Sequence, residues 1–104
     1  MYLVPKPEAK VKAGYGDVFQ CEGPIEFLNG TGVVCQNGGT YDTHFHAVMC
    51  RDNGEVFGGH IVRGTTPVLT TVDLVILEIE GVQMLRTNDE ETALTQFLPI
   101  KGQE

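Results

Sequence analysis

A short turn sequence between two strand-like segments constrains the fold of this chain most. Asp52-Asn53-Gly54 separates Tyr41–Cys50 from Glu55–Val62. Asn and Gly tolerate the positive φ angles of tight turns, and both flanking segments favour extended structure. The sequence therefore predicts an antiparallel β-hairpin around this turn.

The three histidines of the chain lie on this predicted hairpin, as Thr43-His44-Phe45-His46 and Gly58-Gly59-His60. His44 and His46 are two residues apart, so their side chains share one face of a strand. A two-residue loop would place His60 opposite Ala47, on the other face. A three-residue connection ending at Gly54, or a bulge at Gly58-Gly59, would place His60 opposite His46. We predict such an irregularity, with these glycines as its structural turn residues.

Three neutral imidazoles on one face would suit zinc or another divalent metal, with the fourth position left for water or a ligand. Ordinary hydrogen-bonded histidines are the alternative interpretation. An open position would also permit hydrolysis by a metal-bound water, given a general base. Asp73, Glu78 and Glu26 are the candidate carboxylates, and Asp73 could instead orient a ligand histidine. The sequence assigns no catalytic residue.

The remaining pattern predicts a single, strand-dominated α+β domain over residues 1–104, with a mostly antiparallel sheet and few short helices. Short strands are expected at 18–21, 25–28 and 33–35, with a turn at 29–32 between the last two. The apolar stretch 68–79 predicts a central strand covered on both faces, and 82–87 predicts a final strand. Asn88–Thr92 offers a helix start that Pro99 limits to a turn or two. Gly14-Tyr15-Gly16 has too few glycines for a phosphate-binding loop and is assigned no chemistry.

Composition excludes several function classes. Fourteen acidic against seven basic residues give a net charge of −7, which disfavours binding to a nucleic-acid backbone. No apolar run is long enough for a membrane helix, and we read no secretion signal. The three cysteines form no C-x-x-C pair and are odd in number, which predicts reduced thiols in a cytoplasmic protein.

From Glu22 onward the sequence resembles the plant and prokaryote conserved (PPC) domain. The matching blocks, in order, are Glu22-Gly23-Pro24-Ile25-Glu26-Phe27-Leu28, His44-Phe45-His46, Gly54 through Val56-Phe57-Gly58-Gly59-His60, Thr70-Thr71-Val72-Asp73-Leu74-Val75-Ile76, Leu85-Arg86 and Asp89-Glu90-Glu91-Thr92. The resemblance places a PPC core at 22–100, after a variable arm or strand at 1–21. Family members usually begin with a strand, an amphipathic helix and another strand, most of which is missing here. They usually carry Glu where this chain has Asp73.

The resemblance implies a compact domain with a mostly antiparallel sheet, assembled as a homotrimer. It also implies a metal site, usually taken as zinc, at His44, His46 and His60. We therefore expect a homo-oligomeric binding or assembly module that could also take a small-molecule ligand. A metal-dependent hydrolase is one alternative. A DNA-associated regulator is another, but the Arg-Gly-Arg-Pro hooks with which plant relatives grip DNA are missing from this chain.

Overall fold

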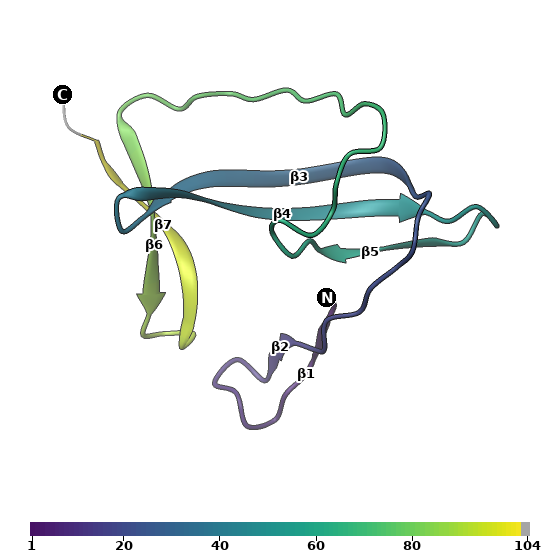
Figure 1. The fold of residues 1–104 in the computed structure, drawn as a ribbon. Coiled ribbons are helices and arrows are strands. Elements are labelled where there is room, and N and C mark those ends of the chain that lie inside the picture. The colour runs from purple at the N-terminus through teal and green to yellow at the C-terminus, as the bar shows by residue number, and fades with distance from the viewer. Residues whose placement is uncertain (103–104) are drawn as a thin grey trace. The chain divides into compact units, whose positions relative to one another are not determined.

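The structure is a computed structural model that describes residues 1–102, which contain strands but no helix (Figure 1). The strands are β1 (Leu3–Pro5), β2 (Ala13–Tyr15), β3 (Glu26–Asn37), β4 (Thr40–Cys50), β5 (Val56–His60), β6 (Val82–Asp89) and β7 (Leu94–Lys101). β1 and β2 form a two-stranded sheet, and the other five are hydrogen-bonded in the order β5-β4-β3-β6-β7. The prediction of a strand-dominated fold is confirmed, but the predicted short helices are not found in the described range. The described residues therefore contain no helix that could cross a membrane.

The chain divides into two compact units. Among the described residues, the first unit contains residues 1–33 and 44–67, and the second contains residues 34–43 and 68–102. Strand pairing is antiparallel between β4 and β5 and between β6 and β7, while β3 pairs with β6 in parallel through Gln36 and Leu85. The sheet is thus mixed.

In the first unit, the hairpin of β4 and β5 has the predicted three-residue connection. The Arg51 N–H donates to the Glu55 carbonyl at 2.9 Å, and the Gly54 N–H donates to the Arg51 carbonyl at 3.0 Å. Gly54 adopts a φ of +84°, as expected for the left-handed residue that closes such a loop. The resulting register pairs Cys50 with Val56 and His46 with His60. The expected irregularity is therefore confirmed, and it lies in the turn.

The predicted turn at residues 29–32 is wrong, because β3 runs through it without interruption. Gly30 and Gly32 are needed there for close packing rather than for a turn. A Cβ on Gly30 would lie 2.6 Å from the Phe27 ring and 2.7 Å from the Phe45 ring. One on Gly32 would lie 2.7 Å from the His44 carbonyl oxygen. The glycines let the aromatic side chain of β4 lie directly against the backbone of β3.

The predicted strand at 18–21 is also wrong, since this segment is irregular. Phe19 holds this segment through ring contacts rather than through strand pairing. The Phe19 ring stacks on Tyr2 at 4.6 Å between centroids and meets the edge of Phe57 at 6.5 Å. Side-chain contacts therefore hold a segment that the apolar pattern alone had assigned to a sheet.

In the second unit, the predicted helix start at residues 88–92 is wrong, because the chain turns there from β6 into β7. The Asp89 carboxylate accepts hydrogen bonds from the Thr92 N–H at 2.9 Å and the Thr92 hydroxyl at 2.5 Å. Ala93 then takes a φ of +58° and donates its N–H to the Asp89 carbonyl. An acidic residue three positions before Thr favours a helix start and a tight turn alike. Here eight cross-strand pairs stabilise the turn.

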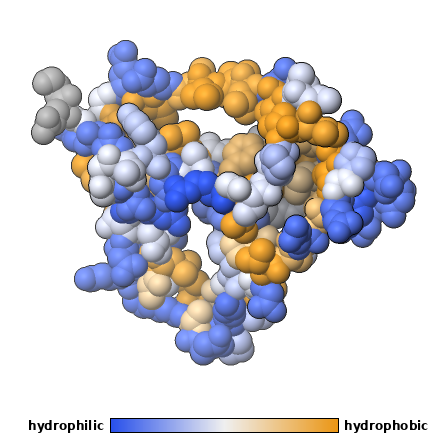
Figure 2. Space-filling model, viewed as in Figure 1, coloured by the Kyte–Doolittle hydropathy of each residue, from blue (hydrophilic) through white to orange (hydrophobic). Residues whose placement is uncertain are grey.

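The apolar segment 68–79 is not a strand, so the prediction of a covered central strand is wrong for this structure. Its large apolar side chains are exposed, with Val75 at 90% and Leu77 at 83%. Figure 2 shows apolar side chains gathered at the surface over the segment that follows β5. Only Cys35 and Ala47 are buried hydrophobic residues in the described part of the chain. The segment has the composition of a core strand, but its side chains are exposed in the described structure.

Candidate metal centre

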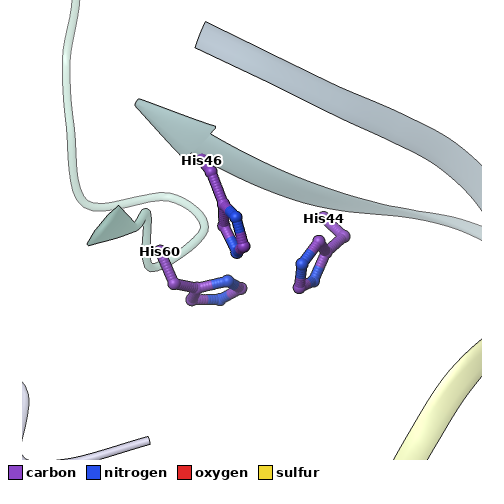
Figure 3. A group of neighbouring side chains, drawn as sticks. All are labelled: His44, His46 and His60. Carbon is purple, nitrogen blue, oxygen red and sulfur yellow. The ribbon is translucent and has the colours of Figure 1, made fainter. Parts of the chain in front are cut away.

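The three histidines come together in the first unit, from two neighbouring strands. His44 and His46 project from one face of β4, and His60 ends β5 directly opposite His46. Figure 3 shows the three rings turned toward a common space. Their centroids lie 4.6 Å (His44–His46), 4.8 Å (His44–His60) and 5.6 Å (His46–His60) apart. The sequence-predicted cluster therefore exists in the folded chain.

The spacing of the ring nitrogens is close to that of a metal site. One nitrogen from each ring lies within 4.8 Å of those of the other two. Ligands held at 2.0–2.1 Å around tetrahedral zinc are about 3.3 Å apart. The nitrogens would need to approach one another by roughly 1.5 Å at most, which small side-chain rotations supply. The residues present therefore fit a metal bound by three imidazoles.

β5 can lie close to β4 and to the N-terminal residues because two glycines precede His60. A Cβ on Gly58 would clash with the Ala47 carbonyl oxygen and lie 3.3 Å from the Val48 Cα. Gly59 has a φ of +150°, and its Cβ would clash with the Met1 carbonyl oxygen. Side chains at either position would separate β5 from its neighbours. These glycines keep His60 next to the histidines of β4.

A comparison with known protein families gives the family that the sequence motifs resemble. The model of the Plants and Prokaryotes Conserved (PCC) domain matches residues 3–80. The chain belongs to the PCC domain family. This is the plant and prokaryote conserved (PPC) domain that the sequence resembles, so the predicted resemblance is confirmed. The match includes all three histidines. It also begins at residue 3, inside the segment that the sequence pattern had set apart as a variable arm. Searches of curated proteins and of solved structures found no match.

Tyr15 is a fourth polar residue at the cluster of this PCC domain, and the sequence pattern did not single it out. Its hydroxyl oxygen lies 3.1 Å from Nε2 of His46, and its ring centroid lies 4.7 Å from that of His60. Tyr15 belongs to β2, far from β4 in the sequence. No local motif could have revealed this contact, because it depends on how the N-terminal hairpin is placed within the first unit.

The candidate carboxylates do not join the histidines. Among the described residues, the group that could hold a metal contains histidines alone. Glu26 is exposed at the start of β3, and Asp73 and Glu78 lie exposed in the segment 68–79 of the second unit. The roles predicted for Asp73 and Glu78 around the metal, or as acid or base, remain predictions.

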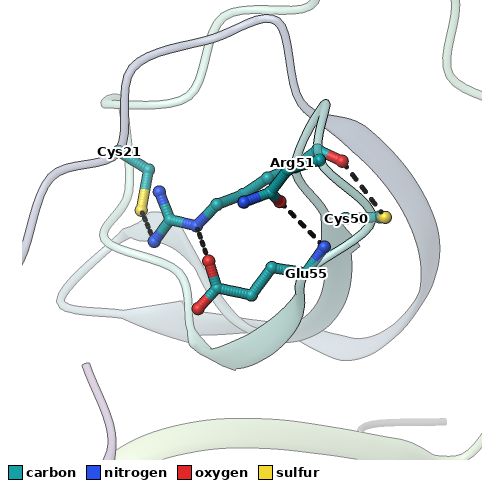
Figure 4. A network of polar contacts seen from close by, with 5 residues as sticks. Cys21, Cys50, Arg51 and Glu55 are labelled. Carbon is teal, nitrogen blue, oxygen red and sulfur yellow. Dashed lines mark hydrogen bonds and ion pairs between the residues drawn. The ribbon is translucent and has the colours of Figure 1, made fainter.

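A separate polar network surrounds the turn of the hairpin (Figure 4). The Arg51 guanidinium donates to Cys21 Sγ at 3.4 Å, lies 3.0 Å from the Glu55 carboxylate, and sits 4.6 Å above the Phe57 ring. The ion pair is partly exposed, with 35% of the Arg51 side chain and 59% of the Glu55 side chain accessible, so solvent screening keeps its contribution to stability small. Its main effect is to connect the chain before β3 to the turn that sets the histidine register.

A depression of about 440 Å³ lies beside the histidines in the first unit. His46, His60 and Tyr15 border it, together with the apolar residues Leu3 and Val48. The depression is open to solvent, and its volume falls within the range of roughly 300–1,000 Å³ that ligand pockets have. A bound molecule in this depression would lie next to the candidate metal site.

Proposed function

We propose that this PCC domain is a homo-oligomeric binding and assembly module with a three-histidine metal site. The observation that carries the proposal is the convergence of His44, His46 and His60, whose nitrogens lie within 4.8 Å of one another. Zinc is the preferred metal because neutral imidazoles are among its usual ligands. Another divalent transition metal would use the same nitrogens.

Self-association is supported by the exposed apolar segment 68–79. Five of its side chains are between 69% and 90% exposed, namely Leu69, Val75, Ile76, Leu77 and Ile79. Burying each would contribute roughly 1.5–3 kcal/mol, so the five together would contribute on the order of 10 kcal/mol. That is comparable with the cost of association. We propose that further copies of the chain cover this segment, in the trimer that the family resemblance implies.

The surroundings of the module are also part of the proposal. The depression beside His46 and His60 would take a small-molecule ligand. The three cysteines are free thiols in the structure, which fits a reducing compartment such as the cytoplasm. The net charge of −7 argues against nucleic acid as a partner. A metal-dependent hydrolase is the alternative, and it would need a general base beside the metal-bound water in addition to the three histidines.

Metal content and native mass test the proposal together. Untagged wild-type protein, His46→Ala and Thr43→Ala would be exposed to zinc, desalted and measured by inductively coupled plasma mass spectrometry. Thr43 is an exposed residue of β4 outside the histidine cluster, so its variant is the matched control. We expect about one zinc per chain in the wild type and the control, and a large loss in His46→Ala. Absence of bound zinc from the wild type would refute the metal site, and a monomeric native mass would refute self-association.

A further inference from the structure

The phenol of Tyr15 lies at the histidine cluster, against His46 and His60. The phenol oxygen is 3.1 Å from Nε2 of His46, and neighbouring ligands of tetrahedral zinc are about 3.3 Å apart. The tyrosine ring also lies beside His60, with 4.7 Å between centroids. The separation of the phenol oxygen and the imidazole nitrogen is that of a hydrogen bond, and it is also close to the spacing of two ligands of one metal ion.

We propose that Tyr15 is the fourth ligand, so that the metal is held by three histidine nitrogens and one phenolate oxygen. This inference depends on the metal site proposed above. On binding, a bond forms between oxygen and metal, the O–H bond of the phenol breaks, and the proton is released to solvent. His46 and Tyr15 exchange their mutual hydrogen bond for bonds to the same ion. No electrons are transferred.

The backbone holds Tyr15 in place independently of any metal. β1 and β2 pair Leu3 with Tyr15, and the Gly16 N–H donates to the Tyr2 carbonyl at 3.0 Å. The same hairpin is joined to the end of β5 by two reciprocal bonds. The His60 N–H donates to the Met1 carbonyl at 2.9 Å, and the Met1 amino group donates to the His60 carbonyl at 3.0 Å. The tyrosine and His60 are therefore positioned by one continuous set of main-chain hydrogen bonds.

A fourth protein ligand changes what the site does. Structural zinc sites have four protein ligands, whereas catalytic sites keep one position for water or substrate. With Tyr15 bound, the site is closed and stabilises the attachment of the N-terminal hairpin to β4 and β5. The metal would then stabilise the folded first unit, which agrees with a binding and assembly module rather than a hydrolase.

Ultraviolet difference spectroscopy during zinc titration tests the proposal directly. Ionisation of a phenol gives a strong near-ultraviolet difference band, and this chain has three tyrosines and no tryptophan to mask it. We would titrate the wild type, Tyr15→Phe and Tyr41→Phe, the last being a matched control at a tyrosine that is 75% exposed. Circular dichroism would verify that each variant is folded.

We expect the tyrosinate band to grow to one equivalent of zinc in the wild type and in Tyr41→Phe. Tyr15→Phe should lack the band and bind zinc at least about tenfold more weakly through the three histidines. Zinc binding without the band in the wild type, with equal affinity in Tyr15→Phe, would overturn the role of Tyr15 and leave the three-histidine site standing. If the wild type binds no zinc at all, the proposed function fails and this inference fails with it.

Discussion

The substitution Gly58→Ala tests whether the close approach of β5 to β4 creates the histidine cluster. The new Cβ would collide with the Ala47 carbonyl oxygen and lie 3.3 Å from the Val48 Cα. Both are backbone atoms of the paired strand, so neither can rotate away as a flexible side chain would. The strain must be relieved by moving β5 away from β4.

The free energy of unfolding would fall in one of two ways, either because the contact is overpacked or because β4 and β5 separate. Overpacking a close contact costs about 1–3 kcal/mol. If the strands separate instead, each hydrogen bond lost between them costs about 0.5–1.5 kcal/mol. We therefore expect the free energy of unfolding to fall by about 1–3 kcal/mol. His60 would move with β5, so zinc affinity should also fall, by about tenfold or more.

Urea denaturation with and without zinc would measure both effects. Gly38→Ala is the control, because Gly38 has a φ of +59° with no atom near its Cβ position. It should lose about 1 kcal/mol from backbone strain while zinc affinity stays unchanged. If Gly58→Ala had the stability and the zinc affinity of the wild type, the packing of β5 on β4 described here would be wrong.

Three further predictions concern the metal, the apolar segment and a buried thiol. Zinc at about 100 times its dissociation constant should raise the free energy of unfolding by about 2.7 kcal/mol at pH 7.5, and this gain should vanish below about pH 6, where protons compete for imidazole nitrogens. Denaturation at the two pH values measures it. Leu77→Glu should lower the native mass by placing a charge on the surface proposed to associate, and an unchanged oligomer would contradict that surface. Burial raises the pKa of the Cys35 thiol above its usual 9.0, the Asp42 carboxylate adds to this, and Arg86 opposes it. The unfolded chain therefore loses this proton at lower pH than the folded chain, so stability should fall as the pH rises above 9, and Cys35→Ala should flatten that dependence.

The sequence alone determined the features that depend on local chemistry. The Asp52-Asn53-Gly54 turn specified a hairpin, and the alternation of side chains along a strand placed His44 and His46 on one face. With a two-residue loop His60 would face the other side of the hairpin, so one extra residue in the connection was required for it to join His44 and His46. Gly54 provides it, with a left-handed backbone that the turn sequence already favoured. These inferences held because each depends on residues close together in the chain.

Tertiary structure decided the features that depend on distant partners. Residues 68–79 have the pattern of a covered strand, but a pattern cannot supply the neighbours that would cover it, and the segment is exposed. Asp89 and Thr92 suit a helix start or a tight turn, and pairing between β6 and β7 selects the turn. Tyr15 reaches His46 because main-chain hydrogen bonds hold the N-terminal hairpin against β5. Short-range preferences thus placed the three histidines on one face of the hairpin. Long-range hydrogen bonding and packing brought the phenol of Tyr15 to them.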